Sequence, residues 1–311
     1  MLKSEIAFNK EKNKIMTFSS YPKKPLRGEI LKKKILIAIG DLPLIPRIVL
    51  NTQLLLINPN SNIEEIGKLL QADPEIAAGV LKVANSSYYG LRTRITSVQR
   101  TIVMLGFKII GEIITAVAIS KFLSKTLKGY RLESEYFWQH SMAVAFISKI
   151  IAEKKMHRLA NDAFLVGLFH DVGKIVIDKY VIERKEAFDE VFNNGQHSFL
   201  SAEEKILGFD HAEMIYELFK KWKFPRHLAV AIKHHHSPFF SKGGELSNII
   251  YVANLIAKMK QNSVPQQIDK RALELLGLQE KEINIIMVEV VETVAKIKKE
   301  IFENYSKSSQ K

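Results

Sequence analysis

The sequence predicts an all-α fold, and three observations support that prediction. From about Gly40 onward, nearly every segment has apolar residues at the spacing of an amphipathic helix. Capping motifs precede several of these segments, as expected where helices begin. No strand-like alternation of apolar and polar residues persists beyond a few positions, and no repeat with a period of about 20–50 residues is present.

Capping residues place the helix starts in the first half of the chain. The stretch 61–64 (Ser-Asn-Ile-Glu) has the form of a capping box, and apolar residues follow it at helical spacing. A second helix is expected to begin at Asp73-Pro74-Glu75, because proline costs little at the first helical position. Ser97 opens a third. The run 109–122 is apolar almost all round, which predicts a buried central helix.

Further helices are expected in the second half of the chain. A second Ser-x-x-Glu motif at Ser201–Glu204 predicts another capped helix. After Pro265 we expect a short helix that ends at Gly277 and then a long helix with one apolar stripe. The other expected helical segments are 137–151, 163–180, 203–219 and 226–235.

Composition excludes several classes of protein. The chain has no cysteine, which excludes disulfides, cysteine-based zinc sites and thiol nucleophiles and fits a reducing compartment. The first 14 residues have scattered charges and no apolar core, unlike a secretory signal. No run of about 18 apolar residues occurs, so we expect no membrane span and a cytoplasmic protein.

The net charge of +13 is concentrated at the N-terminus. Residues 1–35 hold ten Lys or Arg against three Glu, so about half of the excess lies there. We interpret this segment as a basic, disordered arm, followed by a main domain over 36–262 and C-terminal helices over 263–311 that pack on it. Docking of the arm to nucleic acid or an anionic surface is the alternative, but no basic motif interleaved with aromatic residues supports nucleic-acid binding.

Histidines carry the strongest signal of chemistry. His170-Asp171 follows an apolar run, where a carboxylate without a cation or a hydrogen-bond donor would be costly. His140 and His211 are expected near helix starts, and His235-His236 near a helix end. A mixed set of imidazole and carboxylate suits a divalent transition metal such as Fe, Mn, Ni or Zn.

The alternative interpretation is that histidines at helix ends interact only with the helix dipole or with solvent. We apply it to His157, His197 and His227. For the other histidines, spacing alone leaves both interpretations open.

A series of short motifs extends over about residues 38–260. The motifs in the N-terminal half are Asp41–Pro46, Gln71–Pro74, Leu81–Gly90, Ile95–Val98 and Ile102–Gly106. The motifs in the C-terminal half are Trp138–Ser141, His170–Lys174, Leu207–Glu213, Trp222–Pro225 and His235–Pro238. In this order the motifs make the chain similar to the HDOD family.

The resemblance implies a helical bundle like that of the HD-domain phosphohydrolases, in which a metal activates water against a phosphoester. It also implies that Lys174 would contact a phosphate oxygen, as in the HD-GYP branch, which hydrolyses cyclic dinucleotides. The positions that match metal ligands of these enzymes are His140, His170, Asp171, His211, His235 and His236.

The chain departs from the enzymes at three places. Asn254 stands where the enzymes have their final Asp, Tyr136 stands where HD-GYP enzymes have a Glu, and Ser237-Pro238 stands where a Gly-Tyr-Pro loop would begin. Asp171 is then the only carboxylate evident at the site, which favours one metal ion over two.

The prediction from the resemblance is a bacterial signal-transduction module without efficient catalysis, with a single-metal His/Asp site and a protein partner in a signalling pathway. The alternative is a metal-dependent phosphohydrolase or phosphodiesterase that acts on a nucleotide or cyclic dinucleotide. In that case Asp171 and Lys174 are the expected catalytic residues.

Overall fold

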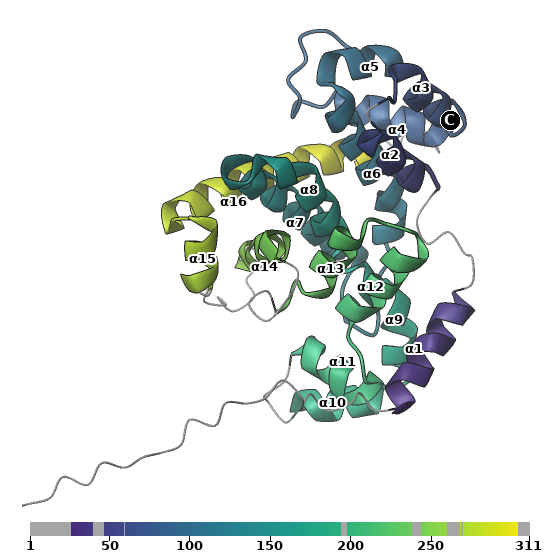
Figure 1. Cartoon of the computed structure of the whole chain (residues 1–311), viewed down its shortest axis with the longest axis vertical. Coiled ribbons are helices and arrows are strands. Elements are labelled where there is room, and N and C mark those ends of the chain that lie inside the picture. The colour runs from purple at the N-terminus through teal and green to yellow at the C-terminus, as the bar shows by residue number, and fades with distance from the viewer. Residues whose placement is uncertain are drawn as a thin grey trace, which may run out of the picture.

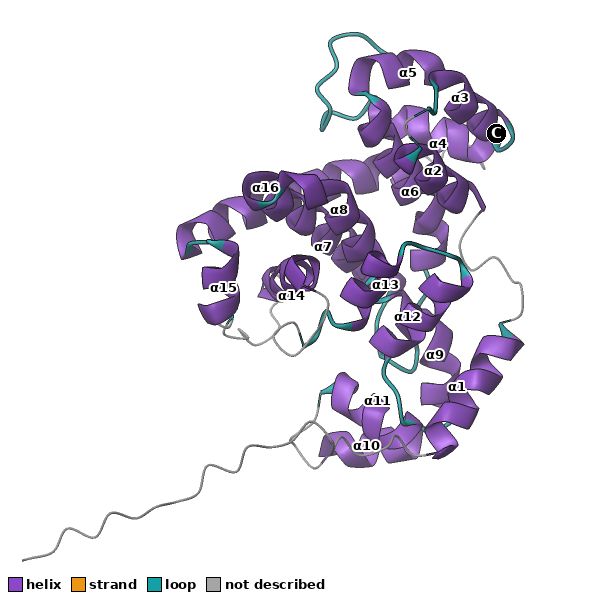
Figure 2. Ribbon diagram, viewed as in Figure 1, coloured by secondary structure: helices purple, strands orange, loops and turns teal. Residues whose placement is uncertain are grey.

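The computed structural model describes residues 26–39, 47–58, 60–193, 198–237, 244–259, 268 and 270–303. Within these ranges the chain is helical and contains no strand, as Figure 2 shows. A lone antiparallel bridge joins Leu127 to Leu132 in the turn before the longest helix. The all-α prediction is confirmed.

The described helices follow one another along the chain. Their bounds are α1 Leu26–Ala38, α2 Arg47–Ile57, α3 Ile63–Gln71, α4 Pro74–Ala84, α5 Val98–Leu105, α6 Phe107–Leu123, α7 Ser134–Lys155, the 3-10 helix η1 His157–Leu159, α8 Ala160–Phe169, α9 Val172–Ile182, α10 Lys185–Asn193, α11 Phe199–Leu207, α12 His211–Lys221, α13 Arg226–Lys233, α14 Gly244–Met259, α15 Lys270–Leu276, α16 Glu280–Lys298 and the π-helix η3 Lys299–Glu303.

Helices α2 to α5 gather at one end of the molecule, where α2, α4 and α5 pack against α6 (Figure 1). The predicted caps of α4 and α5 are present, because Asp73 and Ser97 accept hydrogen bonds from amides in the first turns. The capping box of α3 lies one residue later than predicted. Asn62 caps the helix and Glu65 closes the box, because Asn62 is the residue with extended backbone before the first turn.

Helix α6 connects this end to the rest of the molecule. It packs against α2, α4 and α5 and also against α7 and α8. Its side chains are buried over most of its length, as the apolar run predicted. Helices α7, α8 and α14 pack on one another and form the centre of the second part, with Phe137, Trp138 and Phe169 among the largest fully buried side chains.

The segment 163–180 is two helices, where the periodicity predicted one continuous run. Helix α8 ends at Phe169 and α9 begins at Val172, so that His170 and Asp171 form the turn between them. The apolar pattern did not reveal the break because residues on both sides of it are buried. Helix α9 packs on α12, and α12 packs on α13, so this turn lies near the starts and ends of other helices.

The predicted cap at Ser201 was wrong. Ser198 caps α11, and Ser201 lies inside that helix, where its backbone amide donates a hydrogen bond to the Ser198 hydroxyl oxygen. Glu203, which we had assigned to the capping motif, is fully buried and takes part in the site described below.

The predicted disordered arm is too long at its C-terminal end, because residues 26–38 form helix α1. Ile35 is buried, and the buried Lys32 pairs with Glu213 of α12 at 3.0 Å. At Gly28 a side chain would lie 2.8 Å from the backbone of Gly208, so α1 approaches the α11–α12 turn closely. The many lysines of α1 obscured its apolar positions in the sequence. Residues 1–25 lie outside the described residues.

The two C-terminal helices are present as expected. Helix α15 packs on α14, and α16 runs along α7 until the π-helix η3 reaches α4 (Figure 1). No helix in the described part of the chain has the length and apolar content to cross a membrane.

Candidate metal centre

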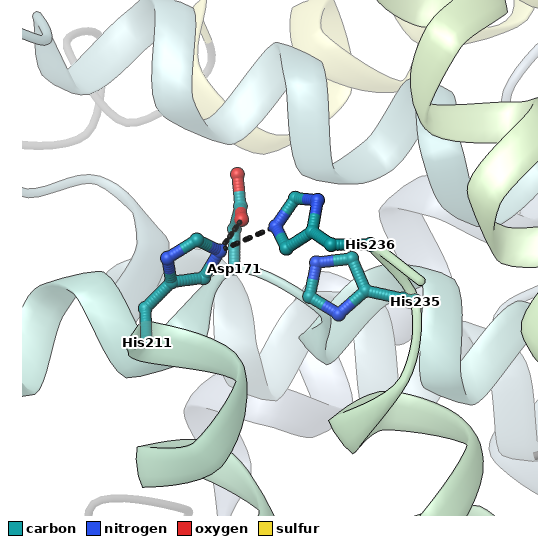
Figure 3. A group of neighbouring side chains, drawn as sticks. All are labelled: Asp171, His211, His235 and His236. Atoms are coloured by element: carbon teal, nitrogen blue, oxygen red, sulfur yellow. Dashed lines mark hydrogen bonds and ion pairs between the residues drawn. The ribbon is translucent and has the colours of Figure 1, made fainter. Parts of the chain in front are cut away.

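The structure brings all six predicted ligand residues together. His140 lies on α7, His170 and Asp171 form the α8–α9 turn, and His211 is the first residue of α12. His235 and His236 follow the end of α13. Figure 3 shows Asp171, His211, His235 and His236 converging from three separate parts of the chain. All six are buried except His236, which is partly buried.

The six side chains form two groups that share Asp171. One group is Asp171, His211, His235 and His236, and the other is His140, His170 and Asp171. Within each group one potential ligand atom of every residue lies within 4.8 Å of the others. Such a spread is compatible with one cation at the centre of each group, because metal–nitrogen bonds to histidine are about 2.0–2.1 Å long.

The hydrogen bonds of two histidines fix their tautomers. Nδ1 of His170 lies 2.8 Å from the carbonyl oxygen of Gly167, and Nδ1 of His235 lies 2.6 Å from that of Ile232. Since a carbonyl oxygen can only accept, each Nδ1 carries the proton and donates it. In the neutral ring each Nε2 offers a lone pair, and in both residues this atom has no hydrogen-bond partner. Metal-ligating histidines are oriented in this way.

His211 is oriented by a buried carboxylate that the sequence did not reveal. Its Nδ1 donates to Glu203 at 2.7 Å, and its backbone amide donates to the same carboxylate at 2.7 Å. The hydroxyl of Tyr130 donates to the other oxygen of Glu203, also at 2.7 Å. Glu203 therefore fixes both the ring and the backbone of His211, and the Nε2 of His211 faces Asp171 at 3.2 Å.

Asp171 is surrounded by groups that favour its ionised form. Lys174 donates to its Oδ2 at 2.7 Å, and Nε2 of His170 and of His140 lie 3.3 and 3.8 Å from the same oxygen. Burial alone would raise the pKa of Asp171, but the protonated form of His170 and the charge of Lys174 hold that pKa well below its usual value. The carboxylate is thus available as an anionic ligand.

The imidazoles differ in their protonation. Burial lowers the pKa values of His140, His235 and His236 well below the usual value, and neighbouring histidines add to the effect. These three rings are neutral at pH 7, the form that binds metal. For His211, burial also favours the neutral ring, but Glu203 outweighs it and raises the pKa to about 9. A cation bound to Nε2 of His211 would have to displace that proton.

The donor set fits a divalent transition metal. Nε2 of His140, His170 and His235 are buried without hydrogen-bond partners. A buried polar atom left unpaired costs free energy, and one cation could satisfy several of these atoms at once. The site also holds more negative charge than the sequence indicates. Glu203 adds a second carboxylate in addition to Asp171, and it is hydrogen-bonded to the far side of the His211 ring.

A cavity of about 370 Å³ opens beside the cluster. The ligand residues that line it are His140, Asp171, His211 and His236. Aromatic rings, leucines, Ser198, Asn254 and two lysines, Lys174 and Lys258, form the rest of its wall. A larger cavity, of about 600 Å³, lies between α4, α6 and η3, and none of the six cluster residues lines it.

Three other histidines were expected to lie outside the metal site, and two residues of the site were not predicted. His157 and His227 are remote from both groups, and His227 pairs with Asp162 at the surface. His197 lies outside the described residues. Glu203 bonds to His211 and Lys258 lines the cavity, but neither was identified from the sequence as part of the site. An acidic residue four positions before a Leu-Gly helix end and a lysine four positions after Asn254 form no distinctive pattern in one sequence.

A family model described as "HDOD domain" matches residues 42–238, more than half of the chain. An uncharacterised protein from Treponema pallidum (strain Nichols) is 21% identical over 245 residues. The matched region covers 78% of this chain and 47% of that protein, so this chain spans about half of the length of its curated relative.

Solved structures agree with the fold. An HDOD domain protein of unknown function from Geobacter sulfurreducens has a TM-score of 0.70 at 23% identity, with 89% of this chain and 98% of that chain covered. A protein from Shewanella amazonensis, named as a candidate phosphohydrolase, has a TM-score of 0.68 at 21% identity, with 86% and 97% covered. A protein from Marinobacter aquaeolei, named as a candidate signal transduction protein, has a TM-score of 0.67 at 18% identity, with 88% and 66% covered.

Proposed function

Because the chain belongs to the HDOD domain family, we propose that it is a signal-transduction module whose His/Asp cluster holds a divalent transition metal for structure rather than turnover. Its output would pass through a protein partner, and the similar Marinobacter protein is named as a candidate signal transduction protein. Of the two groups, the one made of Asp171, His211, His235 and His236 would be the main metal site.

The orientation of the histidine rings carries this proposal. His170, His211 and His235 each donate Nδ1–H to a fixed oxygen acceptor, which directs Nε2 toward the cluster. Packing alone would give His170 and His235 no reason to leave Nε2 buried without a hydrogen-bond partner. Three rings oriented through Nδ1 beside one ionised aspartate make a metal site the simplest account of the arrangement.

Three features disfavour efficient catalysis. Asn254 lines the cavity where a carboxylate could have acted as a base, and an amide cannot take a proton from water. Lys174 is bonded to Asp171, so in this state its charge is partly neutralised. A site crowded by histidines also leaves few open positions on a cation, and catalysis requires at least one.

The cavity beside the cluster favours a second candidate function, a metal-dependent phosphohydrolase or phosphodiesterase for a nucleotide or cyclic dinucleotide. The volume of the cavity is within the usual range of small-molecule sites, and the Shewanella protein is named as a candidate phosphohydrolase. A bound cation would supply Lewis-acid activation of a phosphoester. Asp171 and the histidines would hold it, and Lys174 would turn from Asp171 to a phosphate oxygen.

Elemental analysis of the purified full chain, followed by a phosphoester panel, tests both candidates. The wild type should retain close to one transition-metal ion per chain, and the His170→Ala, Asp171→Ala double variant should retain none. Phosphoester turnover by the metal-loaded wild type that disappears in the double variant would establish the enzyme. Absence of metal from the wild type after incubation with Mn²⁺, Fe²⁺, Ni²⁺ and Zn²⁺ would contradict the metal site itself.

A further inference from the structure

One face of α14 forms the cavity wall to which Asn254 belongs. Tyr251, Asn254, Leu255 and Lys258 all line the cavity. Their spacing of three, four and seven residues places them on one side of the helix. The ammonium of Lys258 thus belongs to the same cavity as Asp171 and Lys174, although the two lysines come from different helices.

The two lysines differ in how their charges are balanced. The ammonium of Lys174 is bonded to Asp171 at 2.7 Å and lies 5.8 Å from the centre of the Tyr130 ring. Lys258 is partly buried and makes no hydrogen bond or ion pair with any described residue. Burial lowers the pKa of Lys258, and the nearby charge of Lys174 lowers it further.

The charges in the cavity wall do not cancel. Lys174 and Lys258 contribute two positive charges, while Asp171 is the one carboxylate among the described residues that line the cavity. Asp171 is already contacted by Lys174 and three histidines. An ammonium held near low-dielectric walls without a counter-ion is costly, so the wall as built favours an anion in the cavity.

We propose that Lys258 and Lys174 form a binding site for a phosphoryl group in this cavity, with Lys258 as the primary contact. The inference rests on the proposed function, in that a cation in the cluster would add positive charge to the same cavity. The ligand would be a compact, multiply charged oxyanion. Free phosphate and the phosphate group of an ester both have this chemistry. A phosphoryl group presents several acceptor oxygens, which two ammonium groups can contact together.

A structural role for Lys258 is the competing explanation. The residue lies in the last turn of α14, where a positive charge interacts favourably with the helix dipole. That role requires a charge at the helix end but no ligand. It therefore predicts that removal of the charge changes stability and leaves anion binding unchanged.

Isothermal titration of the full chain with inorganic phosphate and, separately, with 5′-AMP tests the proposal. The titrations would be run at low ionic strength with metal-loaded and with chelator-treated protein. The variants are Lys258→Gln, Lys258→Arg and, as a matched control for the lost charge, Lys205→Gln on the exposed face of α11. Metal content and thermal unfolding would be measured for each.

We expect Lys258→Gln to weaken phosphate binding about tenfold, since charge-assisted hydrogen bonds have about that effect. Metal content should not change, Lys258→Arg should retain most of the affinity, and Lys205→Gln should bind like the wild type. Tighter binding of 5′-AMP than of phosphate would identify an ester as the ligand class, and equal binding would identify free phosphate.

The outcomes separate this inference from the proposed function. Phosphate affinity that is the same in Lys258→Gln and wild type, or no binding of either probe at millimolar concentration, would overturn the inference even if the cluster holds metal. Binding that depends on Lys258 in a chain that never retains metal would support the inference and contradict the metal site.

Discussion

The two groups of ligand residues that share Asp171 differ in how firmly the rest of the protein holds them. In the group Asp171, His211, His235 and His236, two rings are fixed through Nδ1, one by Glu203 and the other by the carbonyl of Ile232. In the group His140, His170 and Asp171, only His170 is fixed in this way. Neither ring nitrogen of His140 has a hydrogen-bond partner, and its ring stacks on Tyr136.

This difference teaches that proximity and preorganisation are separate properties of a site. Both groups bring their ligand atoms within 4.8 Å, but a ring held in one tautomer and one orientation loses less entropy when it binds a cation. The second group would also gain little from Asn254, whose buried side-chain oxygen is unpaired but uncharged. The first group should therefore bind metal more tightly.

The largest difference in metal binding is expected between two variants that each lack one histidine, one from each group. His211→Ala should reduce metal affinity by at least about a hundredfold, because it deletes the ligand that Glu203 orients. His140→Ala should leave close to one ion per chain, because it removes a ring only from the weaker group. Both variants would be compared by elemental analysis after gel filtration in metal-free buffer. Loss of metal in His140→Ala with retention in His211→Ala would reverse the assignment.

A change behind the first group should have the next largest effect. Glu203→Gln removes the charge that orients His211, and we expect metal affinity to fall by about 10- to 100-fold. The lower pKa of His211 would offset part of the loss, since less work is needed to remove its proton. Competition titration with a chromophoric chelator would measure the affinity.

Tyr130→Phe is the matched control for that change. It deletes the other hydrogen bond to Glu203 but leaves the carboxylate bonded to His211, so metal affinity should fall less than tenfold. Equal losses in the two variants would mean that the packing around Glu203, rather than its bond to His211, sets the affinity.

A smaller effect is expected from a change in the packing between α9 and α12. A methyl group at Gly173 would overlap the carbonyl oxygen of His211, so Gly173→Ala must push the two helices apart. We expect it to lower the free energy of unfolding by about 1–3 kcal/mol, measured by urea denaturation of the metal-free chain. It should also weaken metal binding, because it separates Asp171 from His211.

Gly67→Ala in α3 is the control, since a methyl group there meets only the end of the Gln99 side chain at 3.4 Å. Helix propensity predicts that this variant is as stable as the wild type or more stable. A Gly173→Ala chain as stable as the wild type would show that the α9–α12 contact is free to adjust.

Sequence reasoning predicted the all-α fold and the six side chains that converge, because apolar periodicity and the motifs of a family both leave local traces. It did not predict the groups that hold those side chains in place. Glu203 resembled a helix-capping residue, and the α8–α9 break at His170 is hidden within a continuous apolar pattern. The pairing of Lys32 with Glu213 joins residues 181 positions apart, which no local pattern encodes.

The most direct test of the central claim is anomalous diffraction from a crystal of the full chain grown with one equivalent of Zn²⁺. We expect one strong peak between Asp171 and the Nε2 atoms of His211, His235 and His236, at metal–nitrogen distances of about 2.0–2.1 Å. A peak only between His140 and His170, or only at a surface residue such as His227, would contradict the claim. The metal centre would then not be the first group, Asp171, His211, His235 and His236.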